Sequence, residues 1–563
     1  MKRVLFLLCI VIVAAACQQR VRTPRQVGVL ADSAMVVTAH PLASEVGLQV
    51  LKDGGNAVDA AIAVQFALAV VYPAAGNIGG GGFMILRKAN GDVSTLDYRE
   101  MAPSSADRDM YLDSAGNVIE GLSLLGQLAV GVPGTVDGMI QAHERMGTLP
   151  WKRLVQPAVE LAEKGFALTA REAGLLNEKY EKIRDNSTRP NTYSAKDNWK
   201  KGDSIKHPDL ARTLSFIRDQ GRDGFYTGSV ADSLVAEMQR GNGIISLEDL
   251  ANYKAKWRDP VIGKYKDFDI ISMGPPSSGG IVLLQILKMI EDKDIGSMGF
   301  HSKEAIHLLV EAERRAYADR SKHMGDKDYY PVPIAELLEG TYLKERMASF
   351  NPNQATPSDS VKAGGIVVPE SEETTHYSIV DAQGNAVSIT TTLNASFGSG
   401  CVVGGAGFLL NNEMDDFSIK PGFPNLYGLI GAEANAIEPG KRMLSSMTPT
   451  IIEKDDKLFM VLGTPGGSTI ITSVLQTFLN VAEFGMGMQE AVAAPRFHHQ
   501  WVPELVFHEE GAFKPELLEA LQNIGHAPKQ RDYIGQVEAI WIREDGKIEG
   551  GADIRGDDTA VGY

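Results

Sequence analysis

Two β-branched segments separated by a short turn sequence constrain the fold of this chain more than any other feature. The segments are 374–381 (Thr-Thr-His-Tyr-Ser-Ile-Val-Asp) and 386–394 (Ala-Val-Ser-Ile-Thr-Thr-Thr-Leu-Asn). Between them, Asp381-Ala382-Gln383-Gly384-Asn385 places Asp at the first position of a type I turn and Gly at the left-handed position that follows. The pattern predicts an antiparallel hairpin whose three-residue loop contains a glycine bulge.

This loop determines which residues of the two strands oppose each other. If Asp381 opposes Asn385, then Thr374 lies opposite Thr392, with Cβ atoms about 4.5–5.5 Å apart. Alternation along the strand puts Asn394 on the same face as Thr392. The three side chains form either a functional polar patch or an ordinary strand surface, because Thr is a good strand former.

A glycine-rich turn supplies a second candidate feature. A predicted strand at 457–462 is followed by Gly463-Thr464-Pro465-Gly466-Gly467-Ser468 and then by a helix over 469–481, with Ser468 as its N-cap. A glycine pair before a helix start directs backbone N–H groups and the positive end of the helix dipole at one point. The turn suits a phosphate or the oxyanion of a tetrahedral acyl intermediate, and nothing else in the sequence argues for a nucleotide.

The hairpin follows a segment that reads as a linker. Residues 351–365 are rich in Pro, Ser and Gly and lack hydrophobic periodicity. The chain then passes through Pro369-Glu370-Ser371-Glu372-Glu373 to Thr374. The predicted hydroxyl patch therefore lies where a linker ends and a strand begins.

The first residues predict export rather than part of the fold. Lys2 and Arg3 precede an apolar run over 4–13, and Ala14-Ala15-Ala16 leads to Cys17. Residues 1–16 are typical of a secretory signal peptide and 17–30 of a tether. The small residues before Cys17 favour lipidation of that cysteine. The lipid would anchor the protein to a bacterial membrane on its periplasmic side, and we expect this to be the outer membrane. Such boxes usually carry Leu where this chain has Ala14, so plain signal cleavage is the alternative.

Cysteine content and charge exclude several classes. The chain of 563 residues has three cysteines, and the mature body keeps only Cys401 for disulfide purposes, so stability must come from the core. No activating base neighbours Cys401 in sequence, which favours a structural role. The formal net charge of -16, spread along the chain, argues against nucleic acid as a partner.

The glycine run at 76–82 is a further candidate for an anion loop. It follows an Ala-rich segment over 57–70 that predicts a buried helix. No Gly-Lys-Ser/Thr follows the run, and its spacing is not that of a dinucleotide site. We therefore expect these glycines to allow close approach between layers.

The middle of the chain, about 151–350, is predicted to be mostly helical with a polar surface. The segment 302–318 has the pattern of an amphipathic helix. His301 and His307 lie near it without the spacing of metal ligands. Neither a metal nor a cofactor is expected.

Five motifs, in order along the chain, closely resemble those of the γ-glutamyltransferases, members of the N-terminal-nucleophile hydrolases. The motifs are Asp-Tyr-Arg-Glu-Met-Ala-Pro at 97–103, Thr-Thr-His-Tyr-Ser at 374–378, Leu-Asn-Asn-Glu-Met-Asp-Asp-Phe at 410–417, Leu-Ser-Ser-Met at 444–447 and Gly-Thr-Pro-Gly-Gly-Ser at 463–468. The similarity extends from about residue 30 to Tyr563. It implies an α+β fold, a four-layer αββα sandwich with two central sheets between helices.

The resemblance also implies a precursor that cuts itself between Glu373 and Thr374. The products would be a large subunit, 31–373, and a small subunit, 374–563, interleaved in one structural domain as a heterodimer. The new α-amine of Thr374 would act as the base for the hydroxyl of the same residue.

The resemblance assigns further roles residue by residue. Thr392 would orient the Thr374 hydroxyl, and Gly466 and Gly467 would form the oxyanion hole. A γ-glutamyl group carries an α-carboxylate, matched by Arg99, Ser445 and Ser446, and an α-ammonium, matched by Asn394, Glu413 and Asp416. Tyr427 would be the gate of a lid loop at about 421–438. The alternative for Arg99 and Asp416 is a structural ion pair.

The activity implied is that of a γ-glutamyltransferase and glutathione hydrolase. Its γ-glutamyl-enzyme would be resolved by water or by an amino acid or peptide acceptor. A β-lactam or cephalosporin acylase on the same scaffold is one alternative, and an uncut, non-enzymatic surface lipoprotein is another. Arg99, Glu413, Asp416 and the lid favour a substrate with a free amino-acid head group.

Overall fold

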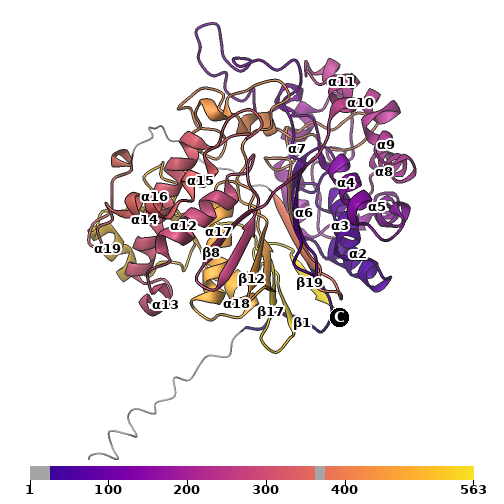
Figure 1. Ribbon diagram of the computed structural model, residues 1–563. Helices are drawn as coiled ribbons and strands as arrows, with labels where there is room; N and C mark the ends of the chain where they lie inside the picture. Colours follow the sequence, from indigo (N-terminus) through magenta and orange to yellow (C-terminus); the bar gives the residue numbers. More distant parts are fainter. Residues whose placement is uncertain (1–25, 362–373) are drawn as a thin grey trace, which may run out of the picture.

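The computed structural model describes residues 26–361 and 374–563. The predicted signal peptide, Cys17 and Glu373 lie outside these residues. Two seven-stranded antiparallel sheets lie face to face at the centre of the molecule, with helices on both outer sides (Figure 1). The four-layer αββα sandwich expected from the sequence is confirmed.

Each sheet mixes strands from before and after the segment 362–373. The first has the order β1-β18-β17-β13-β12-β9-β8 and the second β19-β2-β10-β11-β3-β4-β7. Strands of the first sheet are β1 (Val29–Ala31), β8 (Val261–Tyr265), β9 (Phe268–Ser272), β12 (Thr450–Lys454), β13 (Lys457–Gly463), β17 (Glu538–Ile542) and β18 (Ile548–Gly551). Those of the second are β2 (Met35–Thr38), β3 (Gly81–Arg87), β4 (Val93–Asp97), β7 (Lys256–Arg258), β10 (Thr375–Val380), β11 (Ala386–Thr392) and β19 (Thr559–Gly562). Because β10 and β11 lie between β2 and β3, the two parts of the chain are interleaved.

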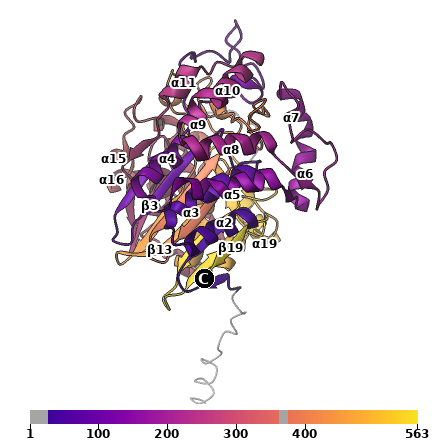
Figure 2. The same ribbon diagram turned by 90° about the vertical axis from the view of Figure 1, so that its right-hand side faces the viewer.

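Helices cover the outer face of each sheet (Figures 1 and 2). On the second sheet lie α2 (Pro41–Lys52) and α3 (Ala57–Val71), with α4 (Thr135–Met146), α5 (Trp151–Lys164) and α8 (Pro208–Gln220) further out. On the first sheet lie α12 (Gly279–Ile290), α17 (Thr469–Ala482) and α18 (Met488–Ala493), with α14 (Lys303–His323) packed on α12.

The remaining elements complete the described chain. The helices are α6 (Ala170–Glu178), α7 (Tyr180–Asn186), α9 (Asp223–Tyr226), α10 (Gly228–Arg240), α11 (Leu247–Asn252), α13 (Ile295–Met298), α15 (Ile334–Leu337), α16 (Gly340–Met347) and α19 (Pro515–Asn523). The strands are β5 (Phe166–Ala167), β6 (Ser204–Ile205), β14 (Phe497–His498), β15 (Val506–His508) and β16 (Pro528–Gln530). Four 3₁₀ turns are η1 (Gln127–Ala129), η2 (Ser358–Ser360), η3 (Glu413–Asp416) and η4 (Glu433–Asn435).

The strands β10 and β11 are buried on both faces, which explains their continuous β-branched and aromatic character. Ile379 belongs to the core beneath α3, whereas its neighbour Val380 packs between the two sheets. Because successive side chains of a strand point to opposite faces, each strand contributes both to the core beneath the helices and to the core between the sheets.

The predicted buried helix and the glycine run are both confirmed. All of α3 is buried, and Asp59 forms a capping box with Asn56 at its start. A Cβ at Gly80 would lie 2.1 Å from the carbonyl oxygen of Thr392. The glycine therefore lets β11 approach the loop before β3 at the point where the candidate patch begins.

The amphipathic prediction for 302–318 is wrong. Helix α14 is longer, with Ser302 as its N-cap, and every residue from Ala305 to Ser321 is buried. Its charged side chains are paired inside the protein, as Arg315 Nη1 is with Glu311 Oε2 at 2.7 Å. A helix buried on all sides keeps a polar sequence pattern only when its charges find partners.

The predicted linker is anchored over its first part. The indole N–H of Trp501 donates to the carbonyl oxygens of Ser358 and Val361, both at 2.9 Å. Up to Val361 the predicted linker forms one 3₁₀ turn, η2, and is held by Trp501 at that turn; residues 362–365 lie outside the described part of the chain.

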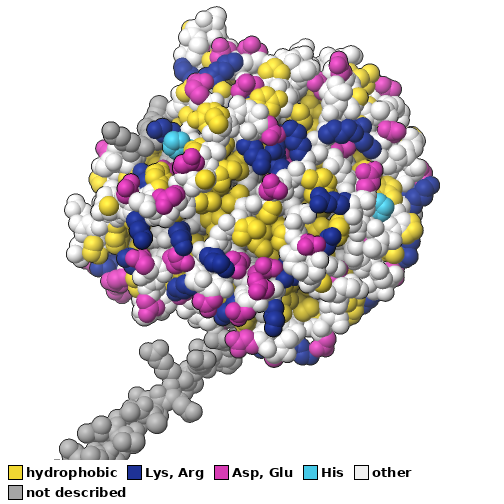
Figure 3. All heavy atoms as spheres, in the orientation of Figure 1, with side chains coloured by type: hydrophobic (Ala, Val, Ile, Leu, Met, Phe, Trp, Pro, Cys, Tyr) yellow, Lys and Arg dark blue, Asp and Glu magenta, His cyan; other side chains and the backbone are white. Residues whose placement is uncertain are grey.

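The spread of charged side chains over the surface and the burial of Cys401 both agree with the sequence analysis. Acidic and basic side chains are interspersed over the face in Figure 3. Burial raises the pKa of the Cys401 thiol to about 12, as a structural cysteine requires. Within residues 26–361 and 374–563, no helix combines the length and apolar character needed to cross a bilayer.

Candidate active site

The hairpin β10–β11 has the register that its turn sequence predicts. Opposed pairs run from Thr375 with Thr391 to Val380 with Ala386. In the loop, Gly384 has a φ of 86°, the left-handed conformation that the bulge requires. The local turn chemistry therefore determines which side chains share a face.

That register brings two hydroxyl groups together at the end of the hairpin. Thr374 Oγ1 donates to Thr392 Oγ1 at 3.4 Å. Thr392 Oγ1 also accepts from the backbone N–H of Asn394 at 2.7 Å, which fixes its position. Thr391 faces the other way, and its hydroxyl donates to Gly81 O at 2.9 Å. Thr374 and Thr392 are both buried, as are all residues of β10 and β11, so the patch is not exposed to solvent.

The turn between β13 and α17 has positive φ angles that favour glycine, 134° at Gly466 and 54° at Gly467. A Cβ at Gly467 would lie 2.3 Å from Tyr427 Cδ1, so a larger residue does not fit. Ser468 occupies the N-cap position with helical φ and ψ, and its side chain makes no capping hydrogen bond. The predicted side-chain cap is wrong; instead, Thr469 Oγ1 donates to Gly466 O at 2.8 Å.

A pocket that opens to solvent joins these elements, and its volume is about 290 Å³ with the open part included. Most of the residues expected from the sequence line it: Arg99, Thr374, Thr392, Asn394, Glu413, Asp416, Tyr427, Ser445, Ser446 and Gly467. They come from six separate parts of the chain, counting the hairpin as one, so the fold alone brings them together.

Arg99 is buried and pairs with three carboxylates. Its Nη1 lies 2.5 Å from Glu413 Oε2 and 3.5 Å from Glu100 Oε2, and its Nη2 bonds Asp416 Oδ2. Burial raises the pKa of Glu413 and Asp416, an effect that Arg99 opposes, and raises the pKa of Glu100 to about 7. The ion pairs left open as an alternative are thus present, and they lie inside the cavity.

Arg320 of α14 is a second buried guanidinium in the cavity, and the sequence did not predict it. Its Nε donates to Ser278 Oγ at 2.9 Å and its Nη2 to Ser446 Oγ at 3.1 Å. Both of these partners are neutral hydroxyls, in contrast to the carboxylates around Arg99. Burial lowers the pKa of Arg320 to about 10. No local motif marks this residue, because only the packing of α14 brings it to the site.

A family model described as Gamma-glutamyltranspeptidase matches residues 43–563. The chain belongs to the γ-glutamyltranspeptidase family. It is 49% identical over 523 residues to the glutathione hydrolase proenzyme of Pseudomonas sp. (strain A14), covering 92% of this chain and 91% of that protein. It is 46% identical over 538 residues to the protein of that name from Escherichia coli (strain K12), covering 95% and 93%. A solved structure of cephalosporin acylase from Bacillus halodurans has a TM-score of 0.84 at 27% identity, covering 97% and 98%.

Family membership agrees with the sandwich and with the motifs from which it was expected. The structure does not describe Glu373 or Cys17, and Gly466 lies in the glycine turn but not among the residues lining the cavity. The individual roles of the site residues stay predictions.

The segment expected to be a lid covers the site. The Tyr427 hydroxyl donates to Asn394 O at 2.6 Å, and the ring is buried against Gly467. The loop is also held by the 413–416 turn, because the backbone N–H of Leu426 donates to Asp415 Oδ2 at 2.8 Å.

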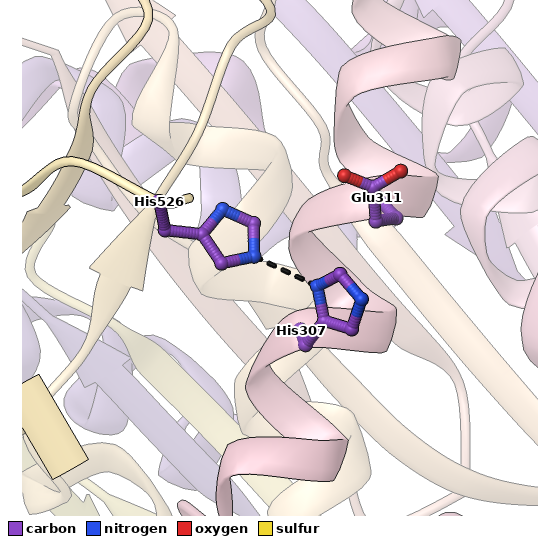
Figure 4. A group of neighbouring side chains, drawn as sticks. All are labelled: His307, Glu311 and His526. Carbon is purple, nitrogen blue, oxygen red and sulfur yellow. Dashed lines mark hydrogen bonds between the residues drawn. The ribbon is translucent and has the colours of Figure 1, made fainter. Parts of the chain in front are cut away.

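One group of possible metal ligands occurs among the described residues, formed by His307, Glu311 and His526 (Figure 4). His307 Nδ1 lies 2.8 Å from His526 Nε2, and His307 Nε2 lies 2.8 Å from Asn351 O. The Glu311 carboxylate already accepts from Arg315 and from the backbone N–H of Thr356. A cation here would compete with those bonds, so the group reads as a hydrogen-bonded structural cluster.

The two neighbouring threonines of β11 provide a test of the register. Thr392→Val keeps the shape but removes the hydroxyl facing Thr374, so turnover of a γ-glutamyl substrate should fall about tenfold or more. Thr391→Val removes the hydroxyl that donates to Gly81 O and accepts from Asn77 Nδ2, so it should lower the free energy of unfolding by about 1–3 kcal/mol and leave turnover nearly unchanged. Rate measurements and denaturant titrations on both variants separate these effects. Equal losses of turnover would contradict the assignment of Thr392.

Proposed function

We propose that this chain is a self-cleaving γ-glutamyltransferase and glutathione hydrolase that uses Thr374 as its nucleophile. The observation that carries the proposal is that the Thr374 hydroxyl shares one cavity with Arg99, Glu413 and Asp416. A nucleophile and a binding site for a charged head group are therefore within reach of one small substrate.

The proposed reaction has two stages. The α-amine of the cleaved Thr374 takes the hydroxyl proton as the oxygen attacks the γ-carbonyl carbon of glutathione. Backbone N–H groups of Gly466 and Gly467 stabilise the oxyanion, and the proton passes to the departing amine as the amide bond breaks. Water or the amine of an amino acid or peptide then attacks the ester and restores the Thr374 hydroxyl. Thr392 holds that hydroxyl in position throughout.

Head-group recognition follows from the charges in the cavity. The α-carboxylate would take a guanidinium and hydroxyl donors, from Arg99, Ser445 and Ser446, and the α-ammonium would take acceptors from Asn394, Glu413 and Asp416. Arg99 is now paired with two of those acids. A zwitterionic head group would replace these internal ion pairs, because its carboxylate would pair with Arg99 and its ammonium with the two acids. No buried charge would then be left unpaired.

Maturation would cut the bond between Glu373 and Thr374 and give the subunits 31–373 and 374–563. The central position of β10 and β11 between β2 and β3 supports an interleaved heterodimer, because neither part has a complete second sheet alone. The α-amine needed as base exists only after this cut.

We further propose that the protein is exported to the periplasm. Residues 1–16 would be removed as a signal peptide, and the residues from a lipidated Cys17 to the start of β1 at Val29 would tether the enzyme to the membrane, so the tether would be shorter than the predicted 17–30. Membrane-associated label from radioactive palmitate, lost in Cys17→Ala, would support the anchor over plain signal cleavage.

Two anilides that differ by one group test the substrate class. γ-Glutamyl 4-nitroanilide carries the α-ammonium, and glutaryl 4-nitroanilide lacks it but keeps the carboxylate. We expect kcat/KM to favour the γ-glutamyl compound about 100-fold, since two charge-assisted contacts of about 1.5 kcal/mol each are lost with the ammonium. Glycylglycine should increase aniline release if peptides act as acceptors.

The alternatives predict different results. A preference for the glutaryl compound would indicate an acylase, in line with the structural similarity to a cephalosporin acylase. No turnover of either compound, together with a single band near 60.8 kDa on a denaturing gel, would indicate an uncut, non-enzymatic protein.

A further inference from the structure

Gln500 joins the lid to the part of the chain that follows α17. Its Nε2 donates to the carbonyl oxygen of Tyr427 at 3.1 Å, and its Oε1 lies 2.8 Å from His498 Nε2. The side chain is buried, yet it does not line the cavity around Thr374. It therefore contacts the lid without being placed to contact a substrate.

The hydrogen bonds around Gln500 have one consistent direction. Because a carbonyl oxygen only accepts, the amide nitrogen of Gln500 must face Tyr427 and the amide oxygen must face His498. His498 Nε2 then carries the proton, and its Nδ1 lies 2.8 Å from the hydroxyl oxygen of Thr472, which can donate either to this nitrogen or to Thr469 O at 3.1 Å. Burial lowers the pKa of His498 to about 3, in agreement with a neutral ring.

This chain of bonds begins on the helix that carries the glycine turn. Thr472 lies in the first turn of α17, which begins at Thr469, two residues after Gly467. At the other end, Tyr427 packs on Gly467 and donates to Asn394 O. The lid is thus attached to the glycine turn twice, once by its ring and once through Gln500.

Two further polar contacts of the lid come from a different part of the site. Asn425 Nδ2 donates to Asp416 Oδ1 at 2.9 Å, and the Leu426 N–H donates to Asp415. These contacts belong to the 413–416 turn, next to the expected head-group site. Gln500 provides a matching contact from the side of α17, so its loss would release one edge of the loop.

We propose that Gln500 is a positioning residue that latches the lid over Thr374 and aligns it with the glycine turn. The inference rests on the proposed function for its kinetic consequence, but the latch itself concerns only the lid. A closed lid would retain the γ-glutamyl donor, and an opened lid would let it leave sooner.

Limited proteolysis measures the latch directly. Chymotrypsin cuts after Leu and Tyr, so an opened lid exposes the bonds after Leu426, Tyr427 and Leu429. Removing the amide in Gln500→Leu should raise the cleavage rate in this segment about fivefold, because the rate follows the open population when opening is fast. Gln500→Glu should raise it further, since a carboxylate oxygen would then face the Tyr427 carbonyl.

Gln285→Leu is the matched control. Gln285 is also buried, and its Nε2 donates to the carbonyl oxygen of Leu337 at 3.0 Å, far from the lid in the chain. We expect this variant to lose stability without faster cutting at 426–429. For Gln500→Leu we also expect a several-fold rise in KM for γ-glutamyl 4-nitroanilide, with kcat changed less than about twofold.

Two results would overturn the latch. One is a cleavage rate at 426–429 in both Gln500 variants equal to that of Gln285→Leu. The other is a proportional loss of kcat and stability with unchanged KM, as a purely structural residue would give. If the wild-type protein does not turn over γ-glutamyl substrates, the proposed function fails, while the proteolysis rates still decide the latch.

Discussion

Thr374→Ala is expected to remain a single full-length chain and to show no measurable turnover of γ-glutamyl 4-nitroanilide. The variant lacks the hydroxyl that would attack both its own preceding peptide bond and the substrate, so both activities should fall by at least about 10³-fold. The change removes one hydroxyl and one methyl group at the residue just before β10, so the fold should persist. A denaturing gel and a rate measurement on the same preparation check the two losses.

Two further variants make this result specific. Thr374→Ser keeps the hydroxyl and should still cut itself, with a reduced rate. Thr375→Val is one residue along on the opposite face, and the Thr375 hydroxyl is buried without a hydrogen-bond partner in the described part of the chain. It should therefore mature and turn over almost as the wild type does. Cleavage of Thr374→Ala at the same bond would show that a protease or another residue performs the cut.

Local chemistry made the hairpin predictable from the sequence. Asp381 and Gly384 can satisfy their backbone preferences only in one loop, and a slip of one residue would turn Thr392 to the other face. The glycine turn was also predictable from local chemistry, because a glycine pair precedes a helix start. The structure explains the glycine at 467, since a Cβ there has no space. The assembly of these pieces came from the resemblance to a family, because spacing alone does not show that Arg99 approaches Glu413.

The remaining features depend on packing between distant segments. Arg320 lies on a helix whose sequence predicts an exposed face, and its role in the cavity appears only once α14 is buried. Gln500 and His498 likewise show no local pattern, because their partners are a lid carbonyl and a threonine of α17. Ser468 is the N-cap residue, as predicted, but its φ and ψ are already helical and its side chain makes no capping hydrogen bond.

Arg99→Lys is expected to raise KM for γ-glutamyl 4-nitroanilide at least about 100-fold while self-cleavage continues. Lysine keeps the positive charge but replaces a planar fork by a single ammonium, so it does not contact Glu413, Asp416 and a substrate carboxylate in the same geometry. Because the charge is retained, the free energy of unfolding should fall by less than the roughly 3–5 kcal/mol that an unpaired buried acid costs.

The decisive comparison is with Arg258→Lys. Arg258 is similarly buried and pairs with Asp97 at 2.7 Å and with Asp328 at 2.9 Å, but it does not line the cavity. Both substitutions replace a buried fork by a point charge, so both should lower the thermal midpoint. Only Arg99→Lys should also raise KM, because only Arg99 shares the cavity with Thr374. Equal effects of the two substitutions on KM would mean that Arg99 stabilises the fold without binding the substrate, and Arg320 with Ser446 would then be the remaining cationic site for the carboxylate.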